Sequence, residues 1–490
     1  MGLQSYFESF RCNIIGVDQI FESAYGERSI IYLDWTASGR LYGAIEDKIK
    51  NTFGPFVGNT HSEASVTGTL MTHAYHQAQK LIKQHLCTGP DDVLLHAGFG
   101  MTAAVNKLQR ILGLKIPEQL SSMVRLPRKE RPVVFITHME HHSNQTSWLE
   151  TLADVVVLHP TFEGLVDLNS LEEHLKRYRH RPLKIGAFTA CSNVTGICTP
   201  YHQMAKLMHE YDGYCFVDFA ASAPYVDICM RPSDESEKLD AIFFSPHKFL
   251  GGPGSSGVLI FDKALYKNRI PDQPGGGTVD WTDPWGHHRF SNNIEVREDG
   301  GTPGILQSIR AALAMQLKGE MGVEKMLARE EELKTLLFRE LRRIPNLIVL
   351  ADHIENRLGI FSFYLKDIHY NLVVKLLNDR FGIQTRGGCL CAGTYGHYLL
   401  HVDQQQSRQI TSRIDQGDLS AKPGWIRLSV HPTTSDKEID IFVDAIKQIS
   451  KHAGKWQAEY NYSSSKNEFY HRCHRGVDIK DWFRLDNNGS

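Results

Sequence analysis

The clearest candidate for chemistry in this sequence is Lys248. It follows the apolar run 241–244, lies beside Ser245 and His247, and precedes a glycine-rich turn at 251–254. A lysine amine held in such a recess is a nucleophile that forms a Schiff base with a carbonyl group. A surface lysine before a turn is the structural alternative. The segment therefore predicts either a covalent anchor for a carbonyl compound or a solvated side chain.

A second candidate, Asp218, ends the apolar run 215–217 and precedes the small residues Ala220 to Ala223. A carboxylate at the bottom of a crevice keeps a pyridinium nitrogen protonated, and small neighbours leave room for a flat ring. The structural alternative for Asp218 is a helix N-cap.

A third candidate is the glycine-rich segment that contains Gly98, Gly100, Met101 and Thr102 and precedes a helical stripe of apolar residues. Glycines and a hydroxyl group at the start of a helix favour phosphate binding, because free amide groups and the helix dipole face the anion. A lysine, an acid and a phosphate seat together are what pyridoxal 5'-phosphate requires. Their combination predicts this cofactor.

These candidate residues are far apart in the sequence, so the fold has to bring them together at one edge of a sheet. Between about residues 90 and 260, short β-branched or aromatic runs alternate with longer stretches of helical period, which is typical of a mostly parallel α/β sheet. Polar residues follow the runs, and open α/β sheets bind ligands at the carboxyl ends of their strands. The predicted strands are 93–95, 133–136, 155–158, 185–188, 215–217, 241–244 and 258–261.

The rest of the chain predicts a second, smaller domain. Apolar residues from Met326 to Ile344 recur at helical spacing, and Pro345 is expected to end that helix. Strand-like segments at 347–350, 359–364 and 425–430 and a helix at 438–449 suit an α+β unit. We expect four parts: a segment 1–30 that joins the small domain, a large cofactor-binding domain 31–314, the small domain 315–454 and an appendage 455–490.

The composition narrows the function classes. The chain has 490 residues, of which 41% are hydrophobic and 22% charged. Its net charge is −2, so the protein as a whole has no positive electrostatic field that would attract nucleic acid. No apolar run reaches the length of a membrane helix, and residues 1–25 lack the layout of a signal peptide. We therefore expect a cytoplasmic protein whose nine cysteines are mostly reduced.

Seven segments of the sequence, spread in order over about residues 30 to 450, resemble class V aminotransferase-fold enzymes. Among these the resemblance is to the group II cysteine desulfurases and selenocysteine lyases. The segments are Tyr32-Leu33-Asp34, Met139-Glu140-His141-His142-Ser143-Asn144, Ser192-Asn193-Val194, Val217-Asp218, Ser245-Pro246-His247-Lys248, Gly301-Thr302-Pro303 and Arg386-Gly387-Gly388-Cys389-Leu390-Cys391-Ala392. The resemblance implies the pyridoxal-phosphate-dependent transferase fold of type I, with a large, mixed, mostly parallel sheet domain and a smaller α+β domain.

The resemblance also implies a role for each matching residue. Lys248 would carry the cofactor, Asp218 would pair with its ring nitrogen, and His141 would stack over the ring. Asn193, Arg386 and Arg427 would bind the substrate. Further cofactor-binding positions are Gly100, Met101, Thr102, Asn193, Ala220, Ser245, His247 and, reaching the phosphate of a neighbouring subunit in a homodimer, Thr302.

The implied reaction removes sulfur or selenium from a cysteine-like amino acid and leaves alanine. Cys391 would take the sulfur as a persulfide, for delivery to an acceptor protein. Two departures from the family pattern bear on this: Ala221 stands where the family has a glutamine, and Cys389 and Leu390 replace expected histidines. The resulting Cys-x-Cys is similar to the N-terminal domain of molybdenum cofactor sulfurases, where the first cysteine could resolve the persulfide or form a redox pair.

Alternatives remain for these residues. Cys389, Cys391, His397 and His401 could instead bind zinc, and His138, His141 and His142 could form a metal cluster. We expect no metal, because the first segment matches a catalytic loop. Neighbouring histidines on a strand point to opposite faces, so His141 would stack and His142 would be structural. The alternative functions are another class V aminotransferase or pyridoxal phosphate lyase, and a non-enzymatic cofactor-binding scaffold.

Overall fold

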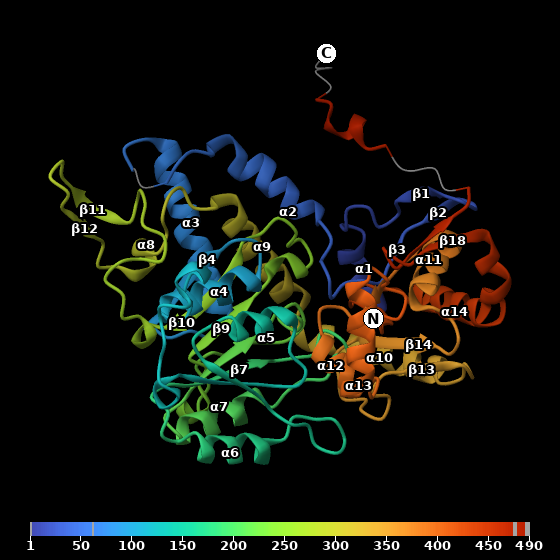
Figure 1. Ribbon diagram of the computed structural model, residues 1–490. Coiled ribbons are helices and arrows are strands. Elements are labelled where there is room, and N and C mark those ends of the chain that lie inside the picture. The colour runs from blue at the N-terminus through green and yellow to red at the C-terminus, as the bar shows by residue number, and fades with distance from the viewer. Residues whose placement is uncertain (1, 61–62, 474–477, 486–490) are drawn as a thin grey trace.

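A seven-stranded sheet forms the centre of the larger lobe (Figure 1). The computed structural model describes residues 2–60, 63–473 and 478–485. The strand order is β4-β10-β9-β8-β7-β5-β6, and only the two pairings of β10 are antiparallel. The strands are β4 (Asp92–Ala97), β5 (Val133–Ile136), β6 (Asp154–Val157), β7 (Lys184–Thr189), β8 (Tyr214–Asp218), β9 (Ala241–Phe244) and β10 (Gly257–Asp262).

All seven predicted strands are confirmed, two of them residue for residue. The reason is burial: β5, β7 and β9 are buried along their whole length, so they read as continuous apolar runs. The larger lobe also contains helices. They are α2 (Gly43–Asp47), α3 (Val66–His85), α4 (Met101–Ile111), α5 (His142–Leu149), α6 (Leu168–Arg177), α7 (Tyr201–Glu210), α8 (Ile294–Arg297) and α9 (Ile305–Met321).

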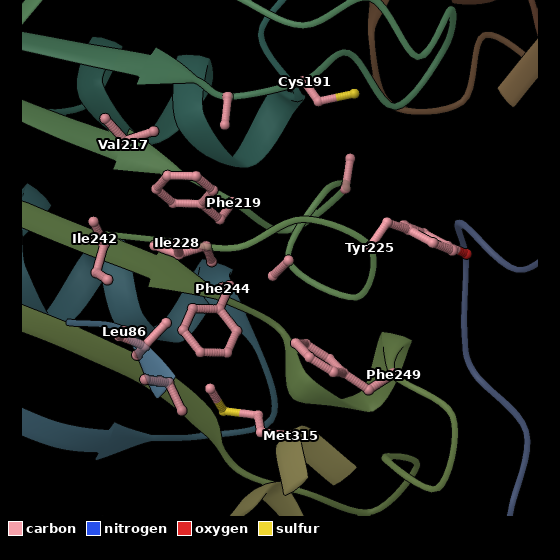
Figure 2. Close-up of a cluster of buried hydrophobic side chains, with 14 of the residues drawn as sticks. Leu86, Cys191, Val217, Phe219, Tyr225, Ile228, Ile242, Phe244, Phe249 and Met315 are labelled. Carbon is pink, nitrogen blue, oxygen red and sulfur yellow. The ribbon is translucent and has the colours of Figure 1, made fainter. Parts of the chain in front are cut away.

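The register of the sheet aligns the ends of its central strands. Thr189 of β7 lies opposite Asp218 of β8, and Asp218 lies opposite Phe243 of β9. The segments that follow these strands therefore leave the sheet at one edge. Below that edge lies a buried apolar cluster that includes Val217, Ile242 and Phe244 (Figure 2), and it gives the edge a rigid base.

A four-stranded antiparallel sheet, in the order β13-β14-β17-β16, forms the smaller lobe (Figure 1). Its strands are β13 (Leu347–Val349), β14 (Ile360–Leu365), β17 (Trp425–Ser429) and β16 (Arg386–Gly388). Its helices are α10 (Val323–Leu341), α11 (Tyr370–Phe381), α12 (Gly393–Leu399), α13 (Gln404–Asp415) and α14 (Asp436–Trp456). The prediction of a mostly parallel α/β sheet domain with a smaller α+β domain is confirmed.

Helix α10 ends earlier than predicted, at Leu341 rather than before Pro345. The next turn tightens, because Arg343 and Ile344 donate to the carbonyl groups three residues earlier, those of Glu340 and Leu341. A residue that precedes proline disfavours the helical conformation, which explains why the helix stops before Ile344. Helix α9, in turn, runs across the predicted domain boundary at residue 314.

The N-terminal segment contacts both lobes. Strand β3 (Ile31–Tyr32) pairs in parallel with β15 (Ile383–Gln384) of the smaller lobe. The hairpin of β1 (Ile20–Ser23) and β2 (Gly26–Ser29) lies against α11. Phe7 of α1 (Leu3–Arg11) belongs to an apolar cluster that includes residues of both lobes, and α1 contacts α10.

A C-terminal hairpin of β18 (Tyr460–Ser463) and β19 (Glu468–His471) packs onto the smaller lobe. Tyr460 and Phe469 are part of its hydrophobic core, and the Asn467 amide donates to the Tyr370 hydroxyl at 2.7 Å. The weak periodicity of this segment hid the hairpin from sequence analysis. A second exposed hairpin, β11 (Val279–Thr282) with β12 (His288–Phe290), projects from the larger lobe (Figure 1). Across the described part of the chain, no helix combines the length and apolar character needed to cross a bilayer.

Candidate active site

Lys248 lines a cavity of about 180 Å³ at the carboxyl edge of the large sheet, which we call the Lys248 cavity. The cavity brings together most of the predicted cofactor-binding residues from five separate segments. Its lining consists of Met101, Thr102, His141, Thr189, Cys191, Asn193, Asp218, Ala220, Ala221, Ser245, His247 and Lys248.

The position of Lys248 is set by the end of β9. Pro246 to Lys248 form one 3-10 turn directly after the strand. A Cβ on Gly252 would lie 1.9 Å from the Pro246 carbonyl oxygen, so only glycine allows the return of the chain. Burial lowers the pKa of the Lys248 amine to about 8, although the Asp218 carboxylate opposes the shift. Near neutral pH a far larger fraction of Lys248 is therefore free amine than of an ordinary lysine.

Asp218 is 3% exposed at the end of β8. Its Oδ1 accepts a hydrogen bond from the Ala220 amide at 2.8 Å, which fixes the carboxyl group. Burial raises the pKa of Asp218 to about 6, and the nearby Lys248 charge works in the other direction. A buried carboxylate with a raised pKa favours a cationic partner such as a ring N–H⁺.

The N-terminus of α4 forms the third side of the Lys248 cavity. The Met101 amide donates to Ser245 Oγ at 2.9 Å, and the Thr102 hydroxyl is 2.7 Å from that of Ser143. A Cβ on Gly100 would lie 2.8 Å from Ser245 Oγ, so glycine permits this close approach. Hydroxyl groups and the positive end of a helix dipole are a suitable seat for a phosphate.

The strand position predicted for His141 is wrong: β5 ends at Ile136, and His141 is the N-cap of α5. Its Nδ1 accepts a hydrogen bond from the Ser143 amide at 3.0 Å, which puts the ring proton on Nε2. Burial, with the nearby Lys248 charge, lowers the pKa of His141 to about 3. The ring is therefore neutral and suited to stacking.

The turn between β5 and His141 is held by Glu140, to which sequence analysis gave no role. Its Oε1 accepts hydrogen bonds from the Thr189 amide at 2.8 Å and the Thr137 hydroxyl at 2.6 Å, and its Oε2 accepts from the Asn144 amide. Burial raises the pKa of Glu140 to about 8. Glu140 thus ties the end of β7 to the His141 turn. Its place inside the motif that contains His141 was the available signal.

Arg427 and Arg386 converge on a residue that sequence analysis also left without a role, Asp34. Arg427 Nη2 donates to Asp34 Oδ1 at 2.8 Å, and Arg386 Nε donates to Oδ2 at 2.9 Å. Arg427 is 3% exposed, and its Nη1 donates to the Asn193 carbonyl at 3.1 Å. Burial lowers the pKa of Arg427, and the Asp34 carboxylate opposes this shift. Asp34 therefore orients both guanidinium groups.

Cys391 lies on the loop between β16 and α12, residues 389–392, that we call the cysteine loop. Leu390 and Cys391 have φ values of 53° and 57°, in the left-handed region that costs about 1 kcal/mol for such residues. The loop is fixed at two points by His142, whose amide donates to the Cys391 carbonyl at 2.7 Å and whose Nε2 accepts from the Gly393 amide at 2.9 Å. Cys391 itself is exposed.

The cysteine loop borders a different cavity from Lys248. Cys389, Cys391 and Arg386 line a cleft of about 780 Å³, which we call the cysteine cleft, together with residues of the C-terminal hairpin. The two cavities are linked by Asn193, whose Nδ2 donates to the Leu390 carbonyl at 2.9 Å. Thr302 lies on an exposed loop and lines neither cavity.

Two of the histidines considered for a metal have other partners. His397 Nδ1 is 2.7 Å from the Gly393 carbonyl, and its Nε2 is 2.9 Å from Ser407 Oγ. His138 Nε2 is 3.1 Å from the Gly164 carbonyl. Within the described ranges, no three His, Cys, Asp or Glu side chains form a group suited to a metal ion.

The Lys248 cavity fits pyridoxal phosphate by its donor set: an amine for the aldehyde, a buried carboxylate for the ring nitrogen, and a helix N-terminus for the phosphate. Asn193 Oδ1 is buried and has no hydrogen-bond partner among the described residues, so it is free to accept from a ring hydroxyl. Ala220 and Ala221 also line the cavity, and their small side chains leave room for a flat ring.

Comparison with known proteins agrees with this geometry. The family model for aminotransferase class-V matches residues 31–442. A probable cysteine desulfurase of Halalkalibacterium halodurans is 26% identical over 367 residues, which cover 74% of this chain and 84% of the relative. Another, from Staphylococcus epidermidis, is 26% identical over 377 residues and covers 76% and 86%.

Solved structures show the same fold. The cysteine desulfurase of Thermococcus onnurineus NA1 superposes with a TM-score of 0.72 at 20% identity, covering 91% of this chain and 98% of that one. A cysteine desulfurase of Escherichia coli gives a TM-score of 0.69 at 21% identity, covering 90% and 98%. The predicted type I fold is thus confirmed, and the chain belongs to the class V aminotransferase family.

Proposed function

We propose that this protein is a pyridoxal-phosphate-dependent enzyme that removes sulfur or selenium from a cysteine-like amino acid and releases alanine. The observation that carries the proposal is the Lys248 cavity, where an amine with a lowered pKa, a buried acid and a helix N-terminus meet. The curated relatives named as probable cysteine desulfurases support the choice of reaction.

Each residue of the candidate site has a separate role in the proposed reaction. Pyridoxal phosphate, when bound through Lys248, withdraws electrons from the substrate Cα, and Asp218 keeps its ring nitrogen protonated. The Lys248 amine, when it is not bonded to the cofactor, would take the Cα proton as a general base. Arg427 and Arg386 bind the substrate carboxylate, a task that suits planar guanidinium groups. Neutral His141 stacks on the ring.

Cys391 completes the reaction. Its thiolate attacks the substrate sulfur, so that a bond between the two sulfur atoms forms as the carbon–sulfur bond of the substrate breaks. The electron pair of the broken bond stays with the carbon skeleton, which takes up one proton at Cβ and regains one at Cα before it leaves as alanine. The exposure of Cys391 suits transfer of the persulfide to an acceptor protein. We place the enzyme in the cytoplasm as a homodimer, with Thr302 reaching the cofactor phosphate of a second subunit.

The test supplies purified, cofactor-loaded protein with L-cysteine and a reductant and measures sulfide and alanine. We expect both products in equal amounts, and we expect Cys391→Ala to abolish sulfide release. Cys12→Ser is the matched control, because Cys12 is equally an exposed free cysteine but lies in the N-terminal segment.

Two results would contradict the proposal. If Cys391→Ala still releases sulfide at the rate of the parent, Cys391 is not the acceptor. If amino groups pass to a keto acid and no sulfide forms, the protein is another class V aminotransferase. Failure of borohydride to label Lys248 in the cofactor-loaded protein would overturn the whole assignment.

A further inference from the structure

Two cysteines outside the cysteine loop face each other beside the Lys248 cavity. Cys191 and Cys198 are partners in an isolated antiparallel bridge. The flanking backbone bonds run from the Thr199 amide to the Ala190 carbonyl at 3.0 Å and from the Ser192 amide to the Ile197 carbonyl at 2.9 Å. These bonds make Cys191 and Cys198 a non-hydrogen-bonded pair, the kind whose Cα atoms lie about 4.5 Å apart. That separation is within the range that a disulfide spans.

The two thiols are chemically different. Cys191 is buried, and burial raises the pKa of its thiol. Cys198 is exposed, and a hydrogen bond from Cys191 lowers the pKa of its thiol. Cys191 Sγ also lies 3.2 Å from the Gly196 carbonyl oxygen, a second acceptor within reach of its single proton. Cys198 is therefore the thiol that a reagent in solution meets first, and it loses its proton more readily than Cys191.

The turn between these cysteines carries part of the candidate active site. Cys191 lines the Lys248 cavity (Figure 2 shows it directly after a strand of the large sheet). Asn193, two residues further, donates to the Leu390 carbonyl and accepts from Arg427. Any shift of the turn is thus transmitted to the cysteine loop and to the candidate carboxylate site.

We propose that Cys191 and Cys198 form a redox-sensitive dithiol whose closure to a disulfide weakens substrate binding in the Lys248 cavity. The oxidant is a low-molecular-weight disulfide. The Cys198 thiolate attacks one of its sulfur atoms and releases a thiolate. The Cys191 thiol then loses its proton and attacks Cys198 Sγ, which releases the second thiolate. The dithiol loses two electrons and two protons, and the small disulfide is reduced to two thiols.

Closure must disturb the turn, because the two sulfur atoms move to about 2.05 Å from each other. Cys191 then has no proton to donate to the Gly196 carbonyl. Asn193 lies between the two cysteines in the chain, inside the loop that the disulfide closes, so its position has to change as well. The effect on binding rests on the proposed function, whereas formation of the disulfide does not.

The experiment uses the full-length, cofactor-loaded protein with Cys389→Ser and Cys391→Ser, so that the cysteine loop cannot react. Oxidised glutathione is the oxidant. Trypsin releases residues 185–206 as one peptide that holds Cys191 and Cys198 and no other cysteine, and we expect it to lose the mass of two hydrogen atoms. L-alanine, the proposed product, is titrated by absorbance of the bound cofactor. We expect its dissociation constant to rise about tenfold on oxidation and to recover with a reductant.

Two variants in the same background serve as controls. Cys198→Ser should show neither the mass loss nor the change in affinity. Cys87 and Cys229 are a second pair of thiols within hydrogen-bonding reach of each other, and neither lines the Lys248 cavity. Replacing both of them by serine should leave the response to oxidised glutathione intact.

An unchanged peptide mass, or a disulfide that leaves the affinity for alanine unchanged, would overturn the proposal. If the reduced protein does not bind alanine at all, the proposed function fails. The peptide mass then still decides by itself whether the disulfide forms.

Discussion

The Lys248 cavity and the cysteine loop differ in their burial and in the part of the fold that holds them. The cavity is more enclosed than the cysteine cleft, is lined by the ends of buried parallel strands and lies on an apolar core. The cysteine loop follows β16 at the edge of the smaller sheet, has two residues in the left-handed region, and exposes Cys391. Only the Asn193 side chain joins the two by a hydrogen bond, to Leu390, among the described residues.

This difference separates two chemical tasks. Burial shifts the pKa of Lys248 and Asp218, which is what binding and activating a cofactor requires. Burial would prevent the other task, because a persulfide has to reach its acceptor. The comparison predicts that substitutions in the cavity abolish all chemistry, whereas substitutions around the loop affect only sulfur release.

The largest effect is expected from Lys248→Ala. Loss of the amine removes both the covalent anchor and the proposed base, so alanine formation from L-cysteine should fall by roughly 10³-fold or more. Lys263→Ala, which removes an exposed lysine, is the control. Alanine formation above a tenth of the parental rate would show that the cavity does not carry the chemistry.

Asp218→Asn should lower alanine formation about 10²-fold, because an amide cannot hold the ring nitrogen protonated. The same change should stabilise the cofactor-free protein. The raised pKa of Asp218 means that native stability is lost as the pH rises from about 4 to 6. A shift of this size corresponds to about 2–3 kcal/mol. Urea unfolding at pH 8 measures it, and a less stable variant would contradict the burial argument.

The pH dependence of cofactor loading tests whether burial lowers the pKa of Lys248. Only the free amine of Lys248 can attack an aldehyde, and its pKa is lowered to about 8. The rate of loading should therefore rise about tenfold per pH unit up to pH 8 and level off above it. Borohydride trapping at timed intervals measures the rate. A rise that continues to pH 10 would mean that Lys248 has an ordinary pKa.

The smallest effect is expected from His142→Ala, which removes the acceptor for the Gly393 amide. One lost hydrogen bond, worth about 1 kcal/mol, should reduce sulfide release about fivefold and leave cofactor absorbance unchanged. The exposed His180→Ala is the control. A loss of cofactor absorbance would show that the loop and the cavity are one unit.

The strands of the large sheet were readable from sequence because their central residues are almost all apolar. Strands β5, β7 and β9 are buried throughout, and His96 in β4 is an exception. The same holds for the cavity residues, since polar side chains that follow parallel strands meet at one edge. The C-terminal hairpin was not readable, because its partners are distant: Asn467 bonds to Tyr370, and Glu459 pairs with Arg380 at 2.7 Å.

Long-range pairing also explains what sequence analysis missed in the candidate site. The arginines at 386 and 427 were visible as residues that could bind a carboxylate, but Asp34 lies more than 350 positions away in the chain. His141 was placed on a strand because a motif does not show where a strand ends. Its side chain instead caps a helix, and the turn before it depends on Glu140, which bonds to Thr189 of another strand.

The shared carboxylate of Asp34 has a consequence for selectivity. Two guanidinium groups and one carboxylate leave a single net positive charge at this point, which equals the charge needed to neutralise one carboxylate of an incoming amino acid. A dicarboxylic amino acid would bring a second carboxylate, and no unneutralised positive charge would remain at this point to bind it. If the two arginines bind the substrate carboxylate as proposed, Asp34 would make the pair selective for amino acids with an uncharged side chain.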